Sequence, residues 1–318
     1  MKSNFVYTVI AGTMLLASTG CHEENITMQS MKCEFVKAGD EAVIYGSGFS
    51  ADDEIFFENN LKGEIVASKT NDSILTVIVP EDAKPGKLCY IPKHGKKVYS
   101  NFMFRDNRGI IIDFDDYRST WGGFDPFDED GEPIKVVSKD DSILSLPVTP
   151  PEAISGHYGL LYGIYKEAWT MKRETFLQYC AKTEHSVAGD NAGMPLEELC
   201  LKFEVYVPKE CTFKSCPRVE MFFGPYESIN KHGREQSPIY AWTPCNTPTG
   251  EFYTKDGWET ITIPLTEFNH SYESDEIKTG PINLRTATNF TFVIIGDPGE
   301  THTENYLCVD NFRIVPIK

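Results

Sequence analysis

Residues 240–265 read YAWTPCNTPTGEFYTKDGWETITIPL, and this stretch indicates the fold class. In its second half, residues 256–265, threonines alternate with isoleucines, and a period of two residues is typical of a half-buried β-strand. Trp258 shares one face of that strand with two threonines, whereas Ile261 and Ile263 share the other face. Similar short strands, separated by Gly and Pro turns, recur along the chain. We therefore predict an all-β protein built from β-sandwiches.

The first half of the same stretch places aromatic residues in a loop rich in Pro and Gly. Aromatic side chains on a rigid β edge can hold the apolar faces of sugar rings, but they also fill the cores of sandwiches. The pattern alone leaves both alternatives open. Trp242, which Pro244 follows closely, is the first candidate for an exposed sugar contact. Trp258 begins a long strand, and we assign it to the structure.

Other aromatic residues are further candidates for contacts with a sugar. Trp121 lies in an irregular loop after the first strand of the domain, and Trp169 could line the same face or pack a helix. Tyr226 and Tyr240 are supporting candidates. Polar partners for sugar hydroxyls could include Glu220, Asn230, Arg234 and Gln236, among which the sequence does not select.

Length and charge limit the classes of partner. A chain of 318 residues predicts two or three domains. Its formal net charge of −17 argues against nucleic-acid binding and against attraction to anionic membranes. The same charge disfavours strongly acidic polysaccharides, whereas neutral sugars are indifferent to it.

The N-terminal segment predicts export. Residues 5–17 form an apolar run that is too short to span a membrane, and Ser18-Thr19-Gly20-Cys21 follows it. This arrangement resembles the lipobox of bacterial lipoproteins, although Ser18 stands where Leu is usual. The resemblance implies a signal peptide over residues 1–20, a lipid anchor on Cys21 and a tether over residues 21–32. The alternative to a lipobox is an ordinary secretory signal in which the cysteine occurs by chance. The acidic residues after Cys21 resemble export tags for the outer cell surface.

Eight of the nine cysteines remain once Cys21 is set aside. An even number in a non-cytosolic protein permits disulfides, and Cys211 with Cys216 is the best local candidate pair. Cys200 and Cys308 lie in apolar, strand-like runs and are candidates for buried thiols. No Cys-x-x-Cys pair occurs, so a zinc ribbon is not indicated.

Residues 33–106 contain short strands and a hairpin signal around Gly95. This segment resembles the IPT/TIG immunoglobulin-like domain. The features that carry the resemblance are Gly39-Asp40, residues 43–49 ending in Gly46-Ser47-Gly48-Phe49, Phe56-Phe57, residues 77–80 ending in Pro80, and Pro85-Gly86. The resemblance implies an immunoglobulin-like sandwich that acts as a spacer, and nothing in the segment indicates catalysis.

Residues 107–318 open with an apolar run at 110–112 and close with a strand around Asp310. These ends resemble those of carbohydrate-binding jelly rolls, in which the first and last strands are neighbours. By that resemblance Asp113, Asp115 and Asp310 are candidate ligands of a structural calcium ion, which prefers oxygen donors. The alternative is that these acids lie at turns and edges in water.

The same domain has a narrower resemblance, to the terminal glycan-binding domain of surface glycan-binding proteins in starch-utilisation-like systems. Residues 201–210, 240–244, 252–265 and 309–316 carry it. It implies non-catalytic capture of a neutral glycan, such as xyloglucan or another glucan or hemicellulose, for a transporter complex in the outer membrane. One departure is Cys245-Asn246-Thr247, where a second aromatic residue would extend a flat platform.

Two other classes of function stay open. A jelly-roll glycoside hydrolase would need a pair of carboxylates, and 47 acidic residues make such a pair easy to imagine. The motifs His-Glu-x-x-His and Gly-x-Ser-x-Gly and a phosphate loop are all absent, so we do not expect an enzyme. The third class is a structural adhesin. Only residues 164–180 and 196–199 could hold short helices.

Overall fold

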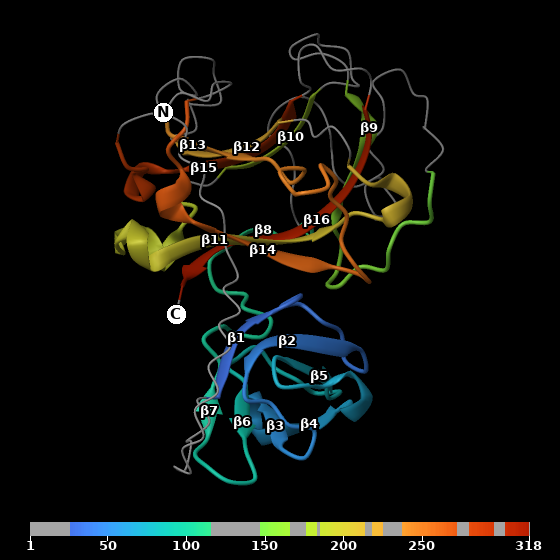
Figure 1. The fold of residues 1–318 in the computed structure, drawn as a ribbon. Coiled ribbons are helices and arrows are strands. Elements are labelled where there is room, and N and C mark those ends of the chain that lie inside the picture. The colour runs from blue at the N-terminus through green and yellow to red at the C-terminus, as the bar shows by residue number, and fades with distance from the viewer. Residues whose placement is uncertain are drawn as a thin grey trace, which may run out of the picture.

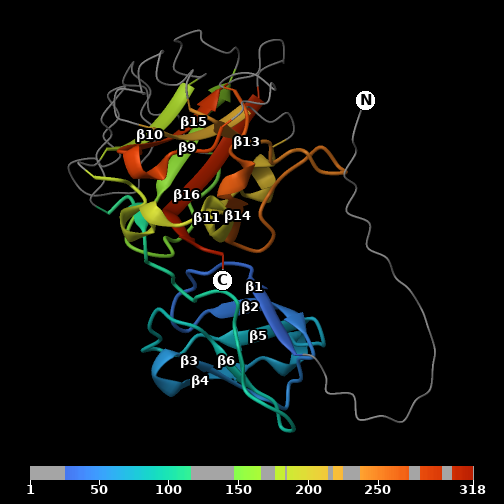
Figure 2. The same cartoon turned by 90° about the vertical axis from the view of Figure 1, so that its left-hand side faces the viewer.

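The structure is a computed structural model that describes residues 26–115, 147–165, 176–182, 185–213, 218–224, 237–271, 280–295 and 303–317. Within these ranges every regular element is a β-strand or a short 3-10 helix. The predicted all-β class is therefore confirmed. None of the helices described is long and apolar enough to cross a membrane. The strands form two bodies, one on top of the other (Figures 1 and 2).

The first body, here called the stalk, contains seven antiparallel strands. They are β1 (Thr27–Met31), β2 (Glu41–Ser47), β3 (Glu54–Phe57), β4 (Leu61–Ile65), β5 (Ile74–Ile78), β6 (Cys89–Ile91) and β7 (Val98–Tyr99), with the 3-10 turns η1 (Glu58–Asn60) and η2 (Ala67–Lys69). The strand order is β1-β2-β5-β4-β3-β6-β7. The hairpin predicted around Gly95 is confirmed, because β6 pairs with β7. Alternate side chains of these strands fill a separate apolar core.

Steric constraints explain why glycine stands twice in the Gly46-Ser47-Gly48-Phe49 segment of the stalk. A Cβ atom on Gly46 would lie 1.9 Å from the carbonyl oxygen of Thr27, so any other residue would push β1 away from β2. Gly48 has a φ of +74°, which side chains with a Cβ rarely adopt. The turn that these glycines permit carries Phe49 into the core, where its ring meets Tyr90 edge-on.

The second domain contains two antiparallel sheets. One has the order β10-β15-β12-β13 and the other the order β14-β11-β16-β8, with β9 also paired to β16. Their bounds are β8 (Ile110–Ile112), β9 (Gly159–Tyr165), β10 (Phe176–Lys182), β11 (Leu199–Tyr206), β12 (Arg218–Gly224), β13 (Ile239–Trp242), β14 (Glu259–Pro264), β15 (Asn289–Ile295) and β16 (Thr303–Pro316). The 3-10 turns are η3 (Gly189–Gly193), η4 (Leu196–Glu198), η5 (Lys209–Cys211), η7 (Leu265–Glu267) and η8 (Leu284–Thr286).

The large core lies between these two sheets. Phe203 on β11 stacks on Phe312 of β16, with ring centroids 4.8 Å apart. The same ring meets Phe292 of the opposite sheet at 6.3 Å. Ile261 and Ile263 of β14 face this core, as the alternation of their strand predicts.

The first and last strands of the domain are neighbours, as predicted, because Ile112 of β8 lies opposite Phe312 of β16. The register of β16 shifts opposite β11, where Glu204 pairs with Asp310 but Lys202 pairs with Arg313. Asn311, with a φ of +50°, occupies this bulge. A bulge re-aims the side chains beside it, and here it places Arg313 on the face of the sheet opposite the core.

The outer face of that sheet is covered by the stalk. Cys33 and Phe35 of the stalk pack with Tyr158, Trp258 and Tyr306 in a small apolar cluster of their own. The backbone N–H of Thr260 donates to the carbonyl of Lys32 at 2.7 Å, so a β14 residue bonds to the stalk backbone. Strands β11 and β16, in the middle of the sheet, are therefore buried on both faces.

Residues 164–180, one of the two segments that could hold a short helix, are described only in part. The described residues belong to strands β9 and β10, and residues 166–175 lie outside the described residues. The short helix expected at residues 196–199 is confirmed as the 3-10 turn η4.

Candidate functional site

The predicted exposure of Trp242 is wrong. Trp242 ends β13 and lies directly opposite Val219 of β12, on the face of the sheet that points into the core. Only 7% of its surface is exposed, and its ring meets Phe203 and Phe252 edge-on at 5.6 and 5.7 Å. Although Pro244 follows closely and suggested an exposed loop, the Trp242 ring packs in the core between the two sheets. Trp242 therefore offers little surface to a sugar.

The neighbouring aromatic residues differ from Trp242. Tyr240 is half-buried, with its ring 5.7 Å from that of Phe268, and burial raises the pKa of its hydroxyl. Tyr253 is exposed. Trp258 is buried against Tyr158 and Tyr206, and its indole N–H donates to the carbonyl of Glu152, which confirms its structural assignment.

Several predicted site residues lie outside the described residues. These are Trp121, Trp169 and Tyr226, the polar candidates Asn230, Arg234 and Gln236, and the anchor residue Cys21. Cys216, the predicted disulfide partner of Cys211, lies outside them too. Glu220 is described and is fully buried on β12, so it cannot reach a ligand on the surface.

The three aspartates predicted as calcium ligands are all described, and each accepts hydrogen bonds from protein groups. In the part of the chain that the structure describes, no group of three or more His, Cys, Asp or Glu side chains could hold a metal ion. Asp113 accepts from the backbone N–H of Asp115, and Asp115 accepts from the backbone N–H of His157. Asp310 accepts from the Ser155 hydroxyl at 2.9 Å and from the backbone N–H of Asn311 at 2.7 Å.

A cluster of buried charges, here called the joint, links the stalk to the second domain. Glu34 of the stalk accepts hydrogen bonds from Lys202 of β11 and, at 2.8 Å, from Arg313 of β16. Arg313 also donates to both carboxylate oxygens of Glu204, at 2.8 and 3.0 Å. Burial lowers the pKa of Arg313, but Glu204 and Glu34 raise it by more, so the guanidinium stays charged. The guanidinium carbon of Arg313 also lies over the Phe35 ring, 4.9 Å from its centroid.

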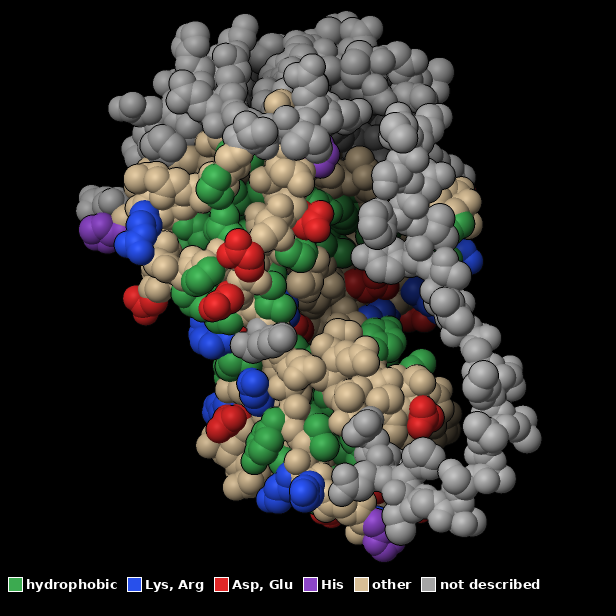
Figure 3. All heavy atoms as spheres, turned by 60° about the vertical axis from the view of Figure 1, so that its left-hand side comes forward, with side chains coloured by type: hydrophobic (Ala, Val, Ile, Leu, Met, Phe, Trp, Pro, Cys, Tyr) green, Lys and Arg blue, Asp and Glu red, His purple; other side chains and the backbone are tan. Residues whose placement is uncertain are grey.

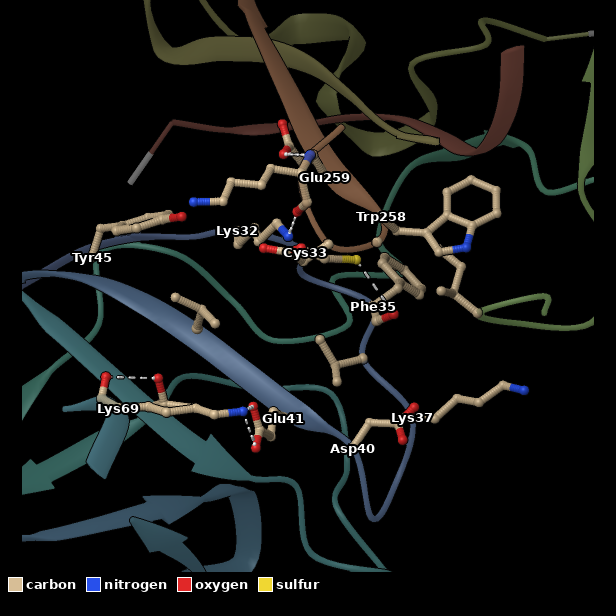
Figure 4. A pocket seen from close by; sticks show the side chains of 17 residues that line it. Lys32, Cys33, Phe35, Lys37, Asp40, Glu41, Tyr45, Lys69, Trp258 and Glu259 are labelled. Atoms are coloured by element: carbon tan, nitrogen blue, oxygen red, sulfur yellow. Dashed lines mark hydrogen bonds and ion pairs between the residues drawn. The ribbon is translucent and has the colours of Figure 1, made fainter. Parts of the chain in front are cut away.

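A groove of about 830 Å³ runs beside the joint, between strands β2 and β5 of the stalk and residues 255–259 of the second domain. Figure 4 shows Tyr45 towards one end of this groove and Trp258 towards the other, with Lys32 and Glu259 between them. Acidic and basic side chains gather in the hollow between the two bodies (Figure 3). The sequence interpretation treated the stalk as a spacer and missed this groove, although the alternation of β2 placed Tyr45 opposite the core-facing Ile44.

Comparison with known families decides the class of the second domain. Residues 104–316 match the family described as "Surface glycan-binding protein B xyloglucan binding domain". The chain belongs to this family. The match covers more than half of the chain. It includes all strands of both sheets of the second domain, so the surface glycan-binding protein B assignment applies to this whole domain. No curated protein matches the chain.

Solved structures support the fold of this family member. The chain is similar to the surface glycan-binding protein PbSGBP-B from Prevotella bryantii, with a TM-score of 0.66 and 18% identity over 92% of this chain and 77% of that one. It is also similar to SGBP-B from a complex xyloglucan utilization locus in Bacteroides uniformis, with a TM-score of 0.56 and 19% identity over 92% and 73% of the two chains. At these identities the likeness concerns the fold alone.

Proposed function

We propose that this protein captures a neutral polysaccharide, xyloglucan or a related glucan or hemicellulose, without cleaving it. The observation that carries the proposal is the match of residues 104–316 to a family of xyloglucan-binding domains. The two similar solved proteins are themselves named as surface glycan-binding proteins. A net charge of −17 suits a neutral ligand, because it would repel an acidic polysaccharide.

In this proposal Trp121 and Trp169 supply the stacking surfaces, and Tyr226 and Tyr240 are supporting contacts. The support for the first three comes from the sequence, where they lie in loop-like or strand-flanking segments of the matched domain. Tyr240 has partial exposure on β13. Trp242 is not part of the proposed contact surface, because its ring belongs to the core.

We place the protein on the outer cell surface, held by a lipid on Cys21, where it would present glycan to an outer-membrane transporter complex. The lipobox-like Ser18-Thr19-Gly20-Cys21 supports the anchor. The stalk, which resembles an IPT/TIG domain in sequence, would set the distance between membrane and glycan. Metabolic labelling with a radioactive or alkyne fatty acid tests the anchor, and Cys21→Ser should abolish the label.

Affinity electrophoresis in gels that contain xyloglucan, mixed-linkage glucan, xylan or no glycan tests the binding function. We expect retardation by at least one neutral glucan, and weaker retardation in Trp121→Ala or Trp169→Ala. Trp242→Phe, which changes a ring buried in the core, should be retarded as the wild type is. Retardation by none of the neutral glycans would refute the proposed function.

The same glycans test the absence of catalysis. We expect no release of reducing ends during prolonged incubation with the retained glycan. Release that survives further purification and disappears on substitution of an acidic residue would establish a glycoside hydrolase instead.

A further inference from the structure

We propose that the groove between stalk and second domain is a second saccharide-binding site, in which Tyr45 is the platform for one sugar ring. The proposal rests on the proposed glycan-binding function and adds a site that lies partly on the stalk. Its ligand is a neutral oligosaccharide segment of the same polysaccharide.

Tyr45 has the exposure that a sugar platform needs. Its side chain projects from β2 and is 39% exposed, whereas most aromatic residues of the described regions are buried. Tyr99, Tyr253 and Ile317 are the other large apolar side chains exposed to this degree among the described residues. Of the three exposed tyrosines, Tyr45 is the one in the groove lining. A tyrosine ring offers a flat apolar face and a hydroxyl that can bond a sugar hydroxyl.

The charges of the groove suit an uncharged ligand. Its lining contains four lysines and four acidic residues: Lys32, Lys37, Lys69, Lys255, Asp40, Glu41, Asp256 and Glu259. This balance contrasts with the net charge of −17 of the whole chain. Lys69 pairs with both carboxylate oxygens of Glu41, at 2.6 and 2.8 Å, and Lys32 donates to the carbonyl of Lys255. A lining with equal numbers of cationic and anionic groups offers donors and acceptors to hydroxyls and favours no ion of either sign.

The groove is formed before any ligand arrives. Its two walls come from different domains, but the bond from Thr260 N–H to the Lys32 carbonyl and the joint between Glu34 and Arg313 connect those domains directly behind it. A preformed site avoids the entropy cost of ordering its walls when the ligand binds. Its volume of about 830 Å³ also falls within the range of ligand sites, roughly 300 to 1,000 Å³.

A hollow of about 510 Å³ extends the groove. It shares Lys32, Tyr45 and Glu259 with the groove and reaches Asn101 and Ile317. Tyr45 therefore stands between two adjoining depressions, an arrangement that lets a chain of sugars continue past the ring on both sides. A polysaccharide long enough to reach this site and a site on the second domain would gain avidity over a short oligosaccharide.

Isothermal titration calorimetry on the full chain tests the proposal, with xylogluco-oligosaccharides, cello-oligosaccharides and xyloglucan polysaccharide as probes. We expect two oligosaccharide sites per wild-type chain and one in Tyr45→Ala. Affinity for the polysaccharide should fall roughly three- to tenfold in that variant. Tyr45→Phe keeps the ring and should keep two sites. Tyr99→Ala, which removes an exposed tyrosine of the same stalk outside the groove, should match the wild type.

The outcomes separate this proposal from the proposed function. Wild-type binding at one site, with Tyr45→Ala unchanged in stoichiometry and affinity, would overturn the groove site and leave glycan binding intact. Binding of none of these glycans by the wild type would overturn both. Equal losses in Tyr45→Ala and Tyr99→Ala would also overturn the groove site, because only one of the two tyrosines lies in it.

Discussion

Glu34 of the stalk and Arg313 of the last strand form an ion pair of 2.8 Å across the boundary between the two domains. Both side chains are almost fully buried, and 279 positions separate them in the sequence. The pair belongs to the joint, in which Lys202 and Glu204 balance the remaining charges. The stalk therefore supplies a charge that the second domain needs in order to bury its own.

Replacing Glu34 should cost far more stability than replacing an exposed glutamate. Glu34→Ala leaves Lys202 and Arg313 buried with one acid between them, and we expect a loss of about 3–5 kcal/mol in unfolding free energy. Glu54→Ala, which breaks an exposed pair with Lys62, is the matched control and should cost less than about 1 kcal/mol. Urea unfolding of both variants measures the difference. Similar losses of unfolding free energy in the two variants would contradict the predicted contribution of the joint to stability.

Trp242→Ala should destabilise the protein by about 3–5 kcal/mol, because it empties a core position between Phe203 and Phe252. Trp242→Phe retains most of the packing and should cost less. Because the ring is buried, Trp242→Phe should bind glycan as the wild type does. Thermal unfolding and affinity electrophoresis of the two variants check this. A folded Trp242→Phe protein that loses glycan affinity would restore Trp242 as a contact residue.

The stability of the protein should depend on the ionisation of Asp310. Burial raises the pKa of this carboxyl well above its usual range, and the nearby Glu204 carboxylate raises it further. A raised folded-state pKa favours the protonated form. Its contribution to stability is therefore complete below the unfolded pKa of about 3.9, and it is lost as the pH rises through the folded pKa.

Asp310→Asn mimics the protonated carboxyl and should remove this loss. The unfolding free energy of the variant relative to wild type should rise by about 1.4 kcal/mol per pH unit above pH 4, until the pH passes the folded pKa. Urea unfolding at several pH values measures the slope. Asp52→Asn, at an exposed ion pair with Lys93, should show no such trend. A flat difference for Asp310→Asn would show that Asp310 ionises normally.

Buried cysteines should resist alkylation in the folded protein. Burial raises the pKa of Cys200 to about 11, and it raises the pKa of Cys33 and Cys308 well above the ordinary value. Few thiolates and little access both slow the reaction. Iodoacetamide labelling followed by mass spectrometry should modify the half-buried Cys89 first, and these three only after urea is added. Early labelling of Cys33 would mean that the joint opens in solution.

Much of the fold was predictable from local patterns. The alternation in residues 259–263 placed Ile261 and Ile263 on the core face, because successive side chains of a strand point to opposite faces. The pairing of the first and last strands of the second domain followed from a family resemblance and is confirmed at Phe312 and Ile112. The match over residues 104–316 agrees with the resemblance drawn from the same strands.

The assignment of side chains to surface or core was less predictable. Trp242 stands beside Pro244 in a loop-like sequence, yet its strand pairs with β12 and turns the ring inward. Asp113 and Asp115 follow β8, whereas Asp310 lies within β16, and the carboxylate of each accepts hydrogen bonds from protein groups. These outcomes depend on partners that are distant in the chain, which no local period encodes.

Strand β11 shows most clearly the difference between what the sequence pattern predicts and what the tertiary structure decides. Its sequence, LCLKFEVY, predicts a strand with one apolar face and one face towards water, because Lys202 and Glu204 alternate with Leu201 and Phe203. The sequence by itself thus determined that this segment is a strand of a sandwich and which of its side chains share each face. Only the tertiary structure decided that the charged face is buried too, since Glu34 of the stalk and Arg313 of β16 neutralise it there. Such charges remain inside because each is paired, and their partners come from opposite ends of the chain.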